Sequence, residues 1–126
     1  MASITDLGKI FIELKELIKS YSPPLVATTD EEARYDLVSI KKVEIEGRKR
    51  SEVYFASIIQ RKDYVGFYFM PVYSAPEMKA FFQPELLGRL KGKSCFHIKS
   101  LDEQLLGQIR QACEKGFHLY QERDWV

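Results

Sequence analysis

Apolar residues recur at helical spacing in two segments, one near each end of the chain. The first set marks one face of a helix that ends at Pro23, because proline cannot continue a helix. Thr5 or Asp6 is its expected N-cap. At the start of the second set, Ser100 and Glu103 have the spacing of a capping box. The two sets are Ile4, Leu7, Ile10, Phe11, Leu14, Leu17, Ile18 and Tyr21, and Leu101, Leu105, Ile109, Ala112, Cys113, Phe117 and Tyr120.

Between these two predicted helices, the pattern changes to that of β-strands. The chain there is rich in Val, Ile, Tyr and Phe, and polar breaks at 46–49 and 61–63 interrupt it. The breaks leave three strands, at about 35–45, 51–60 and 64–70. Connections this short require neighbouring strands to pair antiparallel.

Shorter elements fill the rest of the chain. The alternation of apolar residues slips at 41–42, which predicts a β-bulge in the first strand. Pro76 and Pro84 are placed to begin two short helices. Residues 94–98 are expected to form a fourth strand, and residues 28–32 are interpreted as a polar connection.

These elements predict a single α+β domain over residues 1–126. Its antiparallel four-stranded sheet has the N- and C-terminal long helices packed on one face. The central strands nevertheless carry large apolar side chains on both faces, where a solvated face should be polar. Two alternatives stay open: the short helices cover the second face, or it is a surface for binding or self-association, which would make a homodimer. The expected contact residues in the second case are Tyr54, Tyr68, Met70 and Tyr73.

Composition narrows the class of protein. Apolar residues make up 45% of the 126 residues and charged residues 29%, which is typical of a globular domain. The net charge of +1 gives no overall field that would attract nucleic acid or an anionic membrane. No apolar run could span a bilayer, and the first residues lack the pattern of a signal peptide, so a cytoplasmic protein is expected. Cys95 and Cys113 are then expected to be free thiols.

From the second predicted strand to its end, the chain resembles a known family. The residues that carry the resemblance are 54–56, 65–68 and 90–98, followed by the last amphipathic helix. They are similar to the YdhG-like family, also called domain of unknown function 1801. The resemblance implies an α+β fold with helices against an antiparallel sheet, and it implies no established activity. Family members often have proline directly after Gly-Phe-Tyr, whereas Phe69 and Met70 intervene here.

The same resemblance suggests one cofactor. Some members of the family are likened to frataxins, which are small iron-binding proteins, so iron is the candidate. Iron requires clustered oxygen ligands. Asp30, Glu31 and Glu32 form the only acidic run, and they are the candidate ligands. We favour a solvated polar loop at this position, because the acidic residues of the first predicted helix, where such a site would continue, are interleaved with lysines.

Other chemistry is weakly supported. The basic residues Arg48, Lys49, Arg50, Lys91 and Lys93 lie near aromatic residues and could bind single-stranded nucleic acid. We favour a charged hairpin that protects a sheet edge from aggregation. No arrangement of nucleophile and base is found, and the four cysteines and histidines are not spaced for zinc. The leading hypothesis is therefore a non-enzymatic binding or accessory protein.

Overall fold

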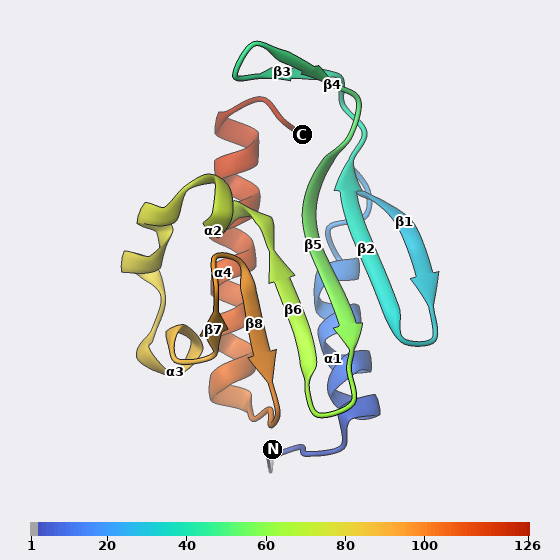
Figure 1. The fold of residues 1–126 in the computed structure, drawn as a ribbon, viewed down its shortest axis with the longest axis vertical. Helices are drawn as coiled ribbons and strands as arrows, with labels where there is room; N and C mark the ends of the chain where they lie inside the picture. Colours follow the sequence, from blue (N-terminus) through green and yellow to red (C-terminus); the bar gives the residue numbers. More distant parts are fainter. Residues whose placement is uncertain (1–2) are drawn as a thin grey trace.

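The computed structural model describes residues 3–126, and Figure 1 shows two long helices behind an antiparallel sheet. The sheet has six strands in the order β1-β2-β5-β6-β8-β7, and β3 and β4 form a separate hairpin. The α+β prediction is confirmed, but the prediction of four strands is wrong. The strands are β1 (Val26–Glu31), β2 (Arg34–Ser39), β3 (Val43–Ile45), β4 (Arg48–Arg50), β5 (Val53–Gln60), β6 (Val65–Phe69), β7 (Leu90–Lys91) and β8 (Cys95–Ile98). The helices are α1 (Leu7–Lys19), α2 (Met70–Ser74), the 3₁₀-helix η1 (Pro76–Phe81), α3 (Pro84–Leu87) and α4 (Glu103–Glu122).

Helix α1 forms where the apolar spacing predicted it, and its N-cap is one of the two residues expected there. Asp6 is the N-cap, and its Oδ1 accepts a hydrogen bond from the backbone N–H of Lys9 at 3.0 Å. Ile4 lies outside the helix and pairs with Leu101 in an isolated bridge. The side chains that α1 buries are Ile10, Phe11, Leu14 and Ile18.

Helix α4 begins later than predicted. Its N-cap is Asp102, whose Oδ1 accepts a hydrogen bond from the N–H of Leu105 at 2.8 Å. Asp102 has an extended backbone, so the helix cannot include it, and the predicted capping box at Ser100 is wrong. Helices α1 and α4 lie on the same side of the sheet, as predicted (Figure 1). Within residues 3–126, no helix is both long and apolar enough to cross a membrane.

Two segments differ from the predicted strands. Residues 28–32, expected to form a connection, lie mostly in the edge strand β1, which is largely exposed on both faces and therefore shows no alternation. The predicted strand 35–45 is two elements, because β2 ends at Ser39 and the chain then leaves the sheet for the β3–β4 hairpin. The slip at 41–42 thus marks a break. A bulge occurs elsewhere, where Phe55 is the extra residue of β5 opposite β2.

Aromatic rings fill the core between the sheet and the helices. The ring of Phe55 lies 5.4–6.1 Å from the rings of Phe69, Phe117 and Tyr120, measured between centroids. The hydroxyl of Tyr120 also donates a hydrogen bond to the backbone carbonyl of Tyr54. These contacts join β5, β6 and α4, so the central strands are fixed against the C-terminal helix.

The short helices extend this core on the helix side of the sheet. Phe82, just after η1, contacts the rings of Phe69 and Phe96 at 6.4 and 5.8 Å. The side-chain oxygen of Gln108 in α4 accepts a hydrogen bond from the N–H of Leu86 in α3 at 3.1 Å. The alternative in which the short helices cover the second face of the sheet is therefore wrong.

The C-terminal tail folds back onto the molecule. The ring of Trp125 lies 5.0 Å from that of Tyr120. The hydroxyl of Ser39 donates to the carbonyl of Trp125, and the ammonium group of Lys41 pairs with the carboxylate of Asp124. The tail thereby fixes residues 39–41, where the chain leaves β2 and continues to the β3–β4 hairpin.

Candidate functional site

The face of the main sheet turned away from α1 and α4 carries no helix among residues 3–126, and we name it the open face (Figure 1). Directly paired residues of antiparallel strands point to the same side, so the register identifies its side chains. The first row across the strands is Asp36, Ser57, Tyr68, Cys95 and Lys91. The second row is Arg34, Ile59, Gly66 and His97.

A hollow of about 80 Å³ lies on this face between β5 and β6. Its lining includes Tyr54, Tyr68 and Met70, so three of the four predicted contact residues lie together. Tyr73 does not join them, because it lies on α2 and its ring lies 5.9 Å from the ammonium group of Lys93. The structure therefore places a concave surface where the sequence predicted aromatic contacts.

Tyr68 is held flat against the sheet. Gly66 has no side chain, and a Cβ built there would lie 2.7 Å from Cε2 of Tyr68, so the ring occupies the space above this glycine. The guanidinium group of Arg61, in the β5–β6 turn, donates a hydrogen bond to the Tyr68 hydroxyl at 3.2 Å. Tyr68 thus has a fixed position beside the hollow.

Two buried polar residues on the open face were missed by the sequence analysis. Asp36 is 2% exposed and Ser57 is 8% exposed, although none of the helices described in residues 3–126 covers this face. The Asp36 carboxylate accepts a hydrogen bond from Nε of Arg34 at 3.0 Å. A polar residue within the apolar runs of β2 and β5 was the available signal. Because the register was unknown, the sequence could not show that Asp36 lies opposite Ser57.

The other end of the open face carries a pair of stacked rings. Tyr64 precedes β6, and its ring lies parallel to that of His97 at 3.8 Å between centroids with an interplanar angle of 9°. Burial lowers the pKa of His97, and the nearby Lys91 and Lys99 lower it further. Burial raises the pKa of the Cys95 thiol, while its hydrogen bond with Tyr68 opposes that change. His97 and Cys95 are therefore held toward their uncharged forms.

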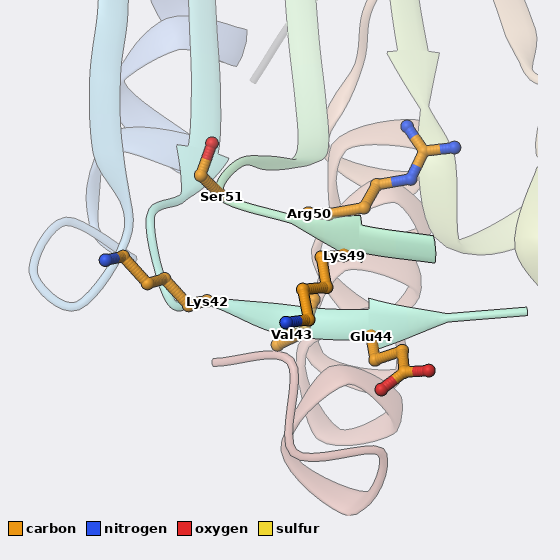
Figure 2. Close-up of a pocket in the computed structure, with 6 residues that line it drawn as sticks. All are labelled: Lys42, Val43, Glu44, Lys49, Arg50 and Ser51. Atoms are coloured by element: carbon orange, nitrogen blue, oxygen red, sulfur yellow. The ribbon is translucent and has the colours of Figure 1, made fainter. Parts of the chain in front are cut away.

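A larger hollow, of about 450 Å³, lies at the β3–β4 hairpin and is shown in Figure 2. Its cationic side chains spread outward from the ribbon, with Lys42 and Arg50 pointing in opposite directions (Figure 2). They do not converge on one point, so this hollow lacks the geometry of a compact anion site. Of the predicted nucleic-acid residues, Arg48, Lys49 and Arg50 lie in β4, whereas Lys91 and Lys93 lie at the β7 edge of the main sheet. The structure does not bring the two groups together.

The candidate iron ligands lie at the opposite edge. Asp30 and Glu31 belong to β1, and Glu32 follows in the turn. The carboxylate of Asp30 forms an ion pair with the ammonium group of Lys15 at 2.6 Å, which uses one of the three candidates. Within the described part of the chain, no three side chains of His, Cys, Asp or Glu are grouped to hold a metal ion. The geometry therefore adds no support for iron at this edge.

The two thiols lie in different parts of the fold. Cys113 is fully buried in α4 and belongs to the core, whereas Cys95 is half-buried on the open face. Both are free. Burial raises the pKa of Cys113, which is typical of an unreactive core thiol.

Comparisons of the chain with models of protein families, with curated proteins and with solved structures find no match. The function of the open face is therefore argued from its own geometry.

Proposed function

We propose that this chain is a non-enzymatic binding protein that receives a side chain of a protein partner on its open face. The observation that supports the proposal is the hollow beside Tyr54, Ser57, Tyr68 and Met70, on a sheet face that the short helices leave free. Membership of the YdhG-like family and a cytoplasmic location remain predictions from the sequence.

The size of the hollow favours a side chain over a whole small molecule. Sites for small molecules usually have a volume of about 300–1,000 Å³. The hollow between β5 and β6 measures about 80 Å³, which is enough for part of one apolar or aromatic side chain. Protein partners are often held by a few such anchors in pockets, surrounded by contacts of smaller effect.

The chemistry of the lining suits an anchor with both apolar and polar atoms. Tyr54 is 41% exposed, so its ring offers contact area that is already partly dehydrated by its neighbours. Tyrosine combines an apolar ring with a hydroxyl group and loses little side-chain entropy on binding. The hydroxyl of Ser57 makes no hydrogen bond within residues 3–126 and lies beside the hollow, where an anchor could satisfy it.

The first partner to test is a second copy of the chain. Sedimentation equilibrium over a range of concentrations should show a reversible dimer for the wild-type protein. Tyr54→Ser should weaken the dimer about tenfold or more, as expected for loss of an interfacial tyrosine. The matched control is Tyr73→Ser, because Tyr73 is also an exposed tyrosine but lies outside the hollow, and this variant should associate like the wild type.

A second measurement covers partners other than a second copy. Para-cresol and N-acetyl-leucine amide imitate anchor side chains, and each can be titrated into ¹⁵N-labelled protein. Selective shifts at the amides of Ser57 and Phe69, reduced in a Ser57→Val variant, support the hollow as the binding point. A monomer at every concentration together with unshifted amides at the hollow would contradict the proposal.

A further inference from the structure

Charge is segregated across the main sheet, although the net charge of the chain is only +1. Residues 26–39, which form β1 and β2, contain four carboxylates and a single cation, Arg34. Residues 86–101, which include β7 and β8, contain four cations and no carboxylate. The sheet therefore has an acidic edge and a basic edge, and a ligand near β8 meets a positive field that the net charge conceals.

Three cations lie around β6 and β8, two from this basic edge and a third, Arg61, from the β5–β6 turn. Lys91 pairs with Cys95, which in turn pairs with Tyr68, so Lys91 belongs to the first row of this face. Lys99, in the bend that follows β8, lies near enough to His97 for its charge to lower the pKa of that histidine. Arg61 reaches the hydroxyl of Tyr68 at 3.2 Å.

These cations are available to a ligand. Within residues 3–126, neither Lys91 nor Lys99 forms an ion pair, and the guanidinium group of Arg61 has the Tyr68 hydroxyl, not a carboxylate, as its partner. Asp63 is the single carboxylate in the β5–β6 turn segment 61–64. An anion in this region would therefore gain several charge-assisted contacts with little competition from protein carboxylates.

The same region has flat rings. Tyr64 and His97 are stacked in parallel at 3.8 Å, and both remain partly exposed. The lowered pKa of His97 keeps its imidazole uncharged at neutral pH, so the pair presents a neutral π-surface beside the cations. Nucleobases stack on such rings, and proteins that bind single strands combine stacking rings with cations that contact phosphate.

We propose that the β6–β8 end of the open face binds a nucleotide, with its base against the Tyr64–His97 pair and its phosphate among Arg61, Lys91 and Lys99. The nucleotide is either free or part of a single strand, since the same rings and cations serve both. This site is separate from the hollow that carries the proposed protein partner. The two share Tyr68 alone, so each can fail without the other.

The test is a titration of the ¹⁵N-labelled 126-residue chain at low salt with four probes: inorganic phosphate, adenosine, adenosine monophosphate and a short oligothymidylate. We expect the mononucleotide or the oligonucleotide to shift the amide signals of Gly66 and His97. Adenosine and phosphate should each bind more weakly, because each makes only half of the contacts. Added salt should weaken binding of the phosphate-bearing probes.

Variants separate stacking from charge. Tyr64→Leu should weaken nucleotide binding between about fivefold and a hundredfold, the range expected for loss of one base–aromatic stack. Lys91→Gln should weaken it and reduce its dependence on salt. Lys49→Gln is the matched control, because Lys49 is an exposed lysine on the β3–β4 hairpin, which is separate from the sheet that contains β8. Lys91→Gln removes no core contact, so it stays informative even where Tyr64→Leu lowers stability.

The possible results distinguish a free nucleotide from a single strand and show whether the proposed site exists. Binding of both nucleotide probes with similar affinity supports a free nucleotide, and binding of the oligonucleotide alone supports a single strand. No selective shift with either nucleotide probe at low salt would overturn the proposal. Equal weakening by Lys91→Gln and Lys49→Gln would also overturn it, because the protein would then bind anions through its general surface. Phosphate binding as tight as the mononucleotide would exclude a role for the rings.

Discussion

At the scale of single residues, the open face depends on one glycine. Gly66 lies in the middle of a sheet, where glycine usually weakens a strand because it packs nothing and has more backbone freedom to lose. Here the ring of Tyr68 occupies the space above it. Because Gly66 has no side chain, the ring of Tyr68 can lie flat against the sheet beside the hollow.

Gly66→Ala tests this relationship. The new Cβ would lie 2.7 Å from Cε2 of Tyr68, so we expect the ring to move and the Arg61–Tyr68 hydrogen bond to break. The free energy of unfolding should fall by about 1 kcal/mol, the lower end of the cost of overpacking. Urea unfolding measures the stability, and the amide shift of Ser57 on addition of para-cresol reports on the hollow.

A double-mutant cycle identifies the cause. In a Tyr68→Thr background the ring is absent, and Gly66→Ala should then stabilise the protein by about 0.5–1 kcal/mol, because alanine loses less backbone entropy than glycine. If Gly66→Ala is equally costly in both backgrounds, the strain lies in the backbone and Gly66 does not position Tyr68.

At the scale of elements, α4 approaches the start of α2 through another glycine. A Cβ on Gly116 would lie 2.5 Å from Cζ of Phe69 and 2.8 Å from Cγ of Pro71. A Cβ on Gly107, in the same helix, would meet nothing within 4 Å. Alanine at either position raises helix propensity by the same amount, but only at Gly116 does the new methyl group meet neighbouring atoms, so the two glycines form a matched pair.

We expect opposite effects of alanine at these two positions. Gly107→Ala should stabilise the protein by about 1 kcal/mol through helix propensity alone. Gly116→Ala gains the same propensity but forces α4 away from Phe69 and Pro71, so it should destabilise the protein by about 1–3 kcal/mol. Thermal and urea unfolding of the two single variants would measure these changes in the free energy of unfolding. If both variants are more stable than the wild type, α2 and α4 can move apart at little cost.

Elements that bury many side chains were predictable from the sequence. Helices α1 and α4 bury side chains at helical spacing, and strands β5 and β6 are buried along most of their length, so both patterns are visible in the chain. The edge strand β1 was missed because it buries almost nothing, and its strand conformation depends on pairing with β2. Likewise, the end of β2 at Ser39 depends on a contact with Trp125, which is distant in sequence.

The candidate site was predictable only in part, for the same reason. Large residues on both faces of β5 and β6 indicated that the second sheet face is unusual, and Tyr54, Tyr68 and Met70 do lie together there. The row that joins Asp36 to Ser57 and the Tyr64–His97 stack depends on strand register, which apolar alternation does not determine for pairs across distant strands. The sequence therefore showed which types of residue the site contains, but not which of them are in contact.

At the scale of the whole molecule, folding removes from water, wholly or in part, phenol groups in the core and packed against it. Burial raises the pKa of Tyr21 from its ordinary value of 10.0 to about 12. Burial also raises the pKa of Tyr120, whose hydroxyl is bonded to the carbonyl of Tyr54. The folded protein thus keeps protons that the unfolded chain releases above pH 10, and unfolding at alkaline pH is accompanied by proton release.

The consequence is a loss of stability at high pH. The contribution of each raised phenol is fully present below pH 10 and disappears as pH rises through its folded pKa, so the free energy of unfolding should decline from about pH 10 upward. Urea unfolding followed by the fluorescence of Trp125 measures it. Tyr120→Phe should cost about 1 kcal/mol at neutral pH, through the lost hydrogen bond, and should make the decline shallower. Tyr73→Phe, at an exposed tyrosine, is the control and should follow the wild type. The free energy of unfolding of Tyr120→Phe could instead decline with pH as steeply as that of the wild type. The Tyr120 hydroxyl of the wild type would then titrate in the folded protein as it does in the unfolded chain, which would mean that α4 opens from β5 before the molecule unfolds.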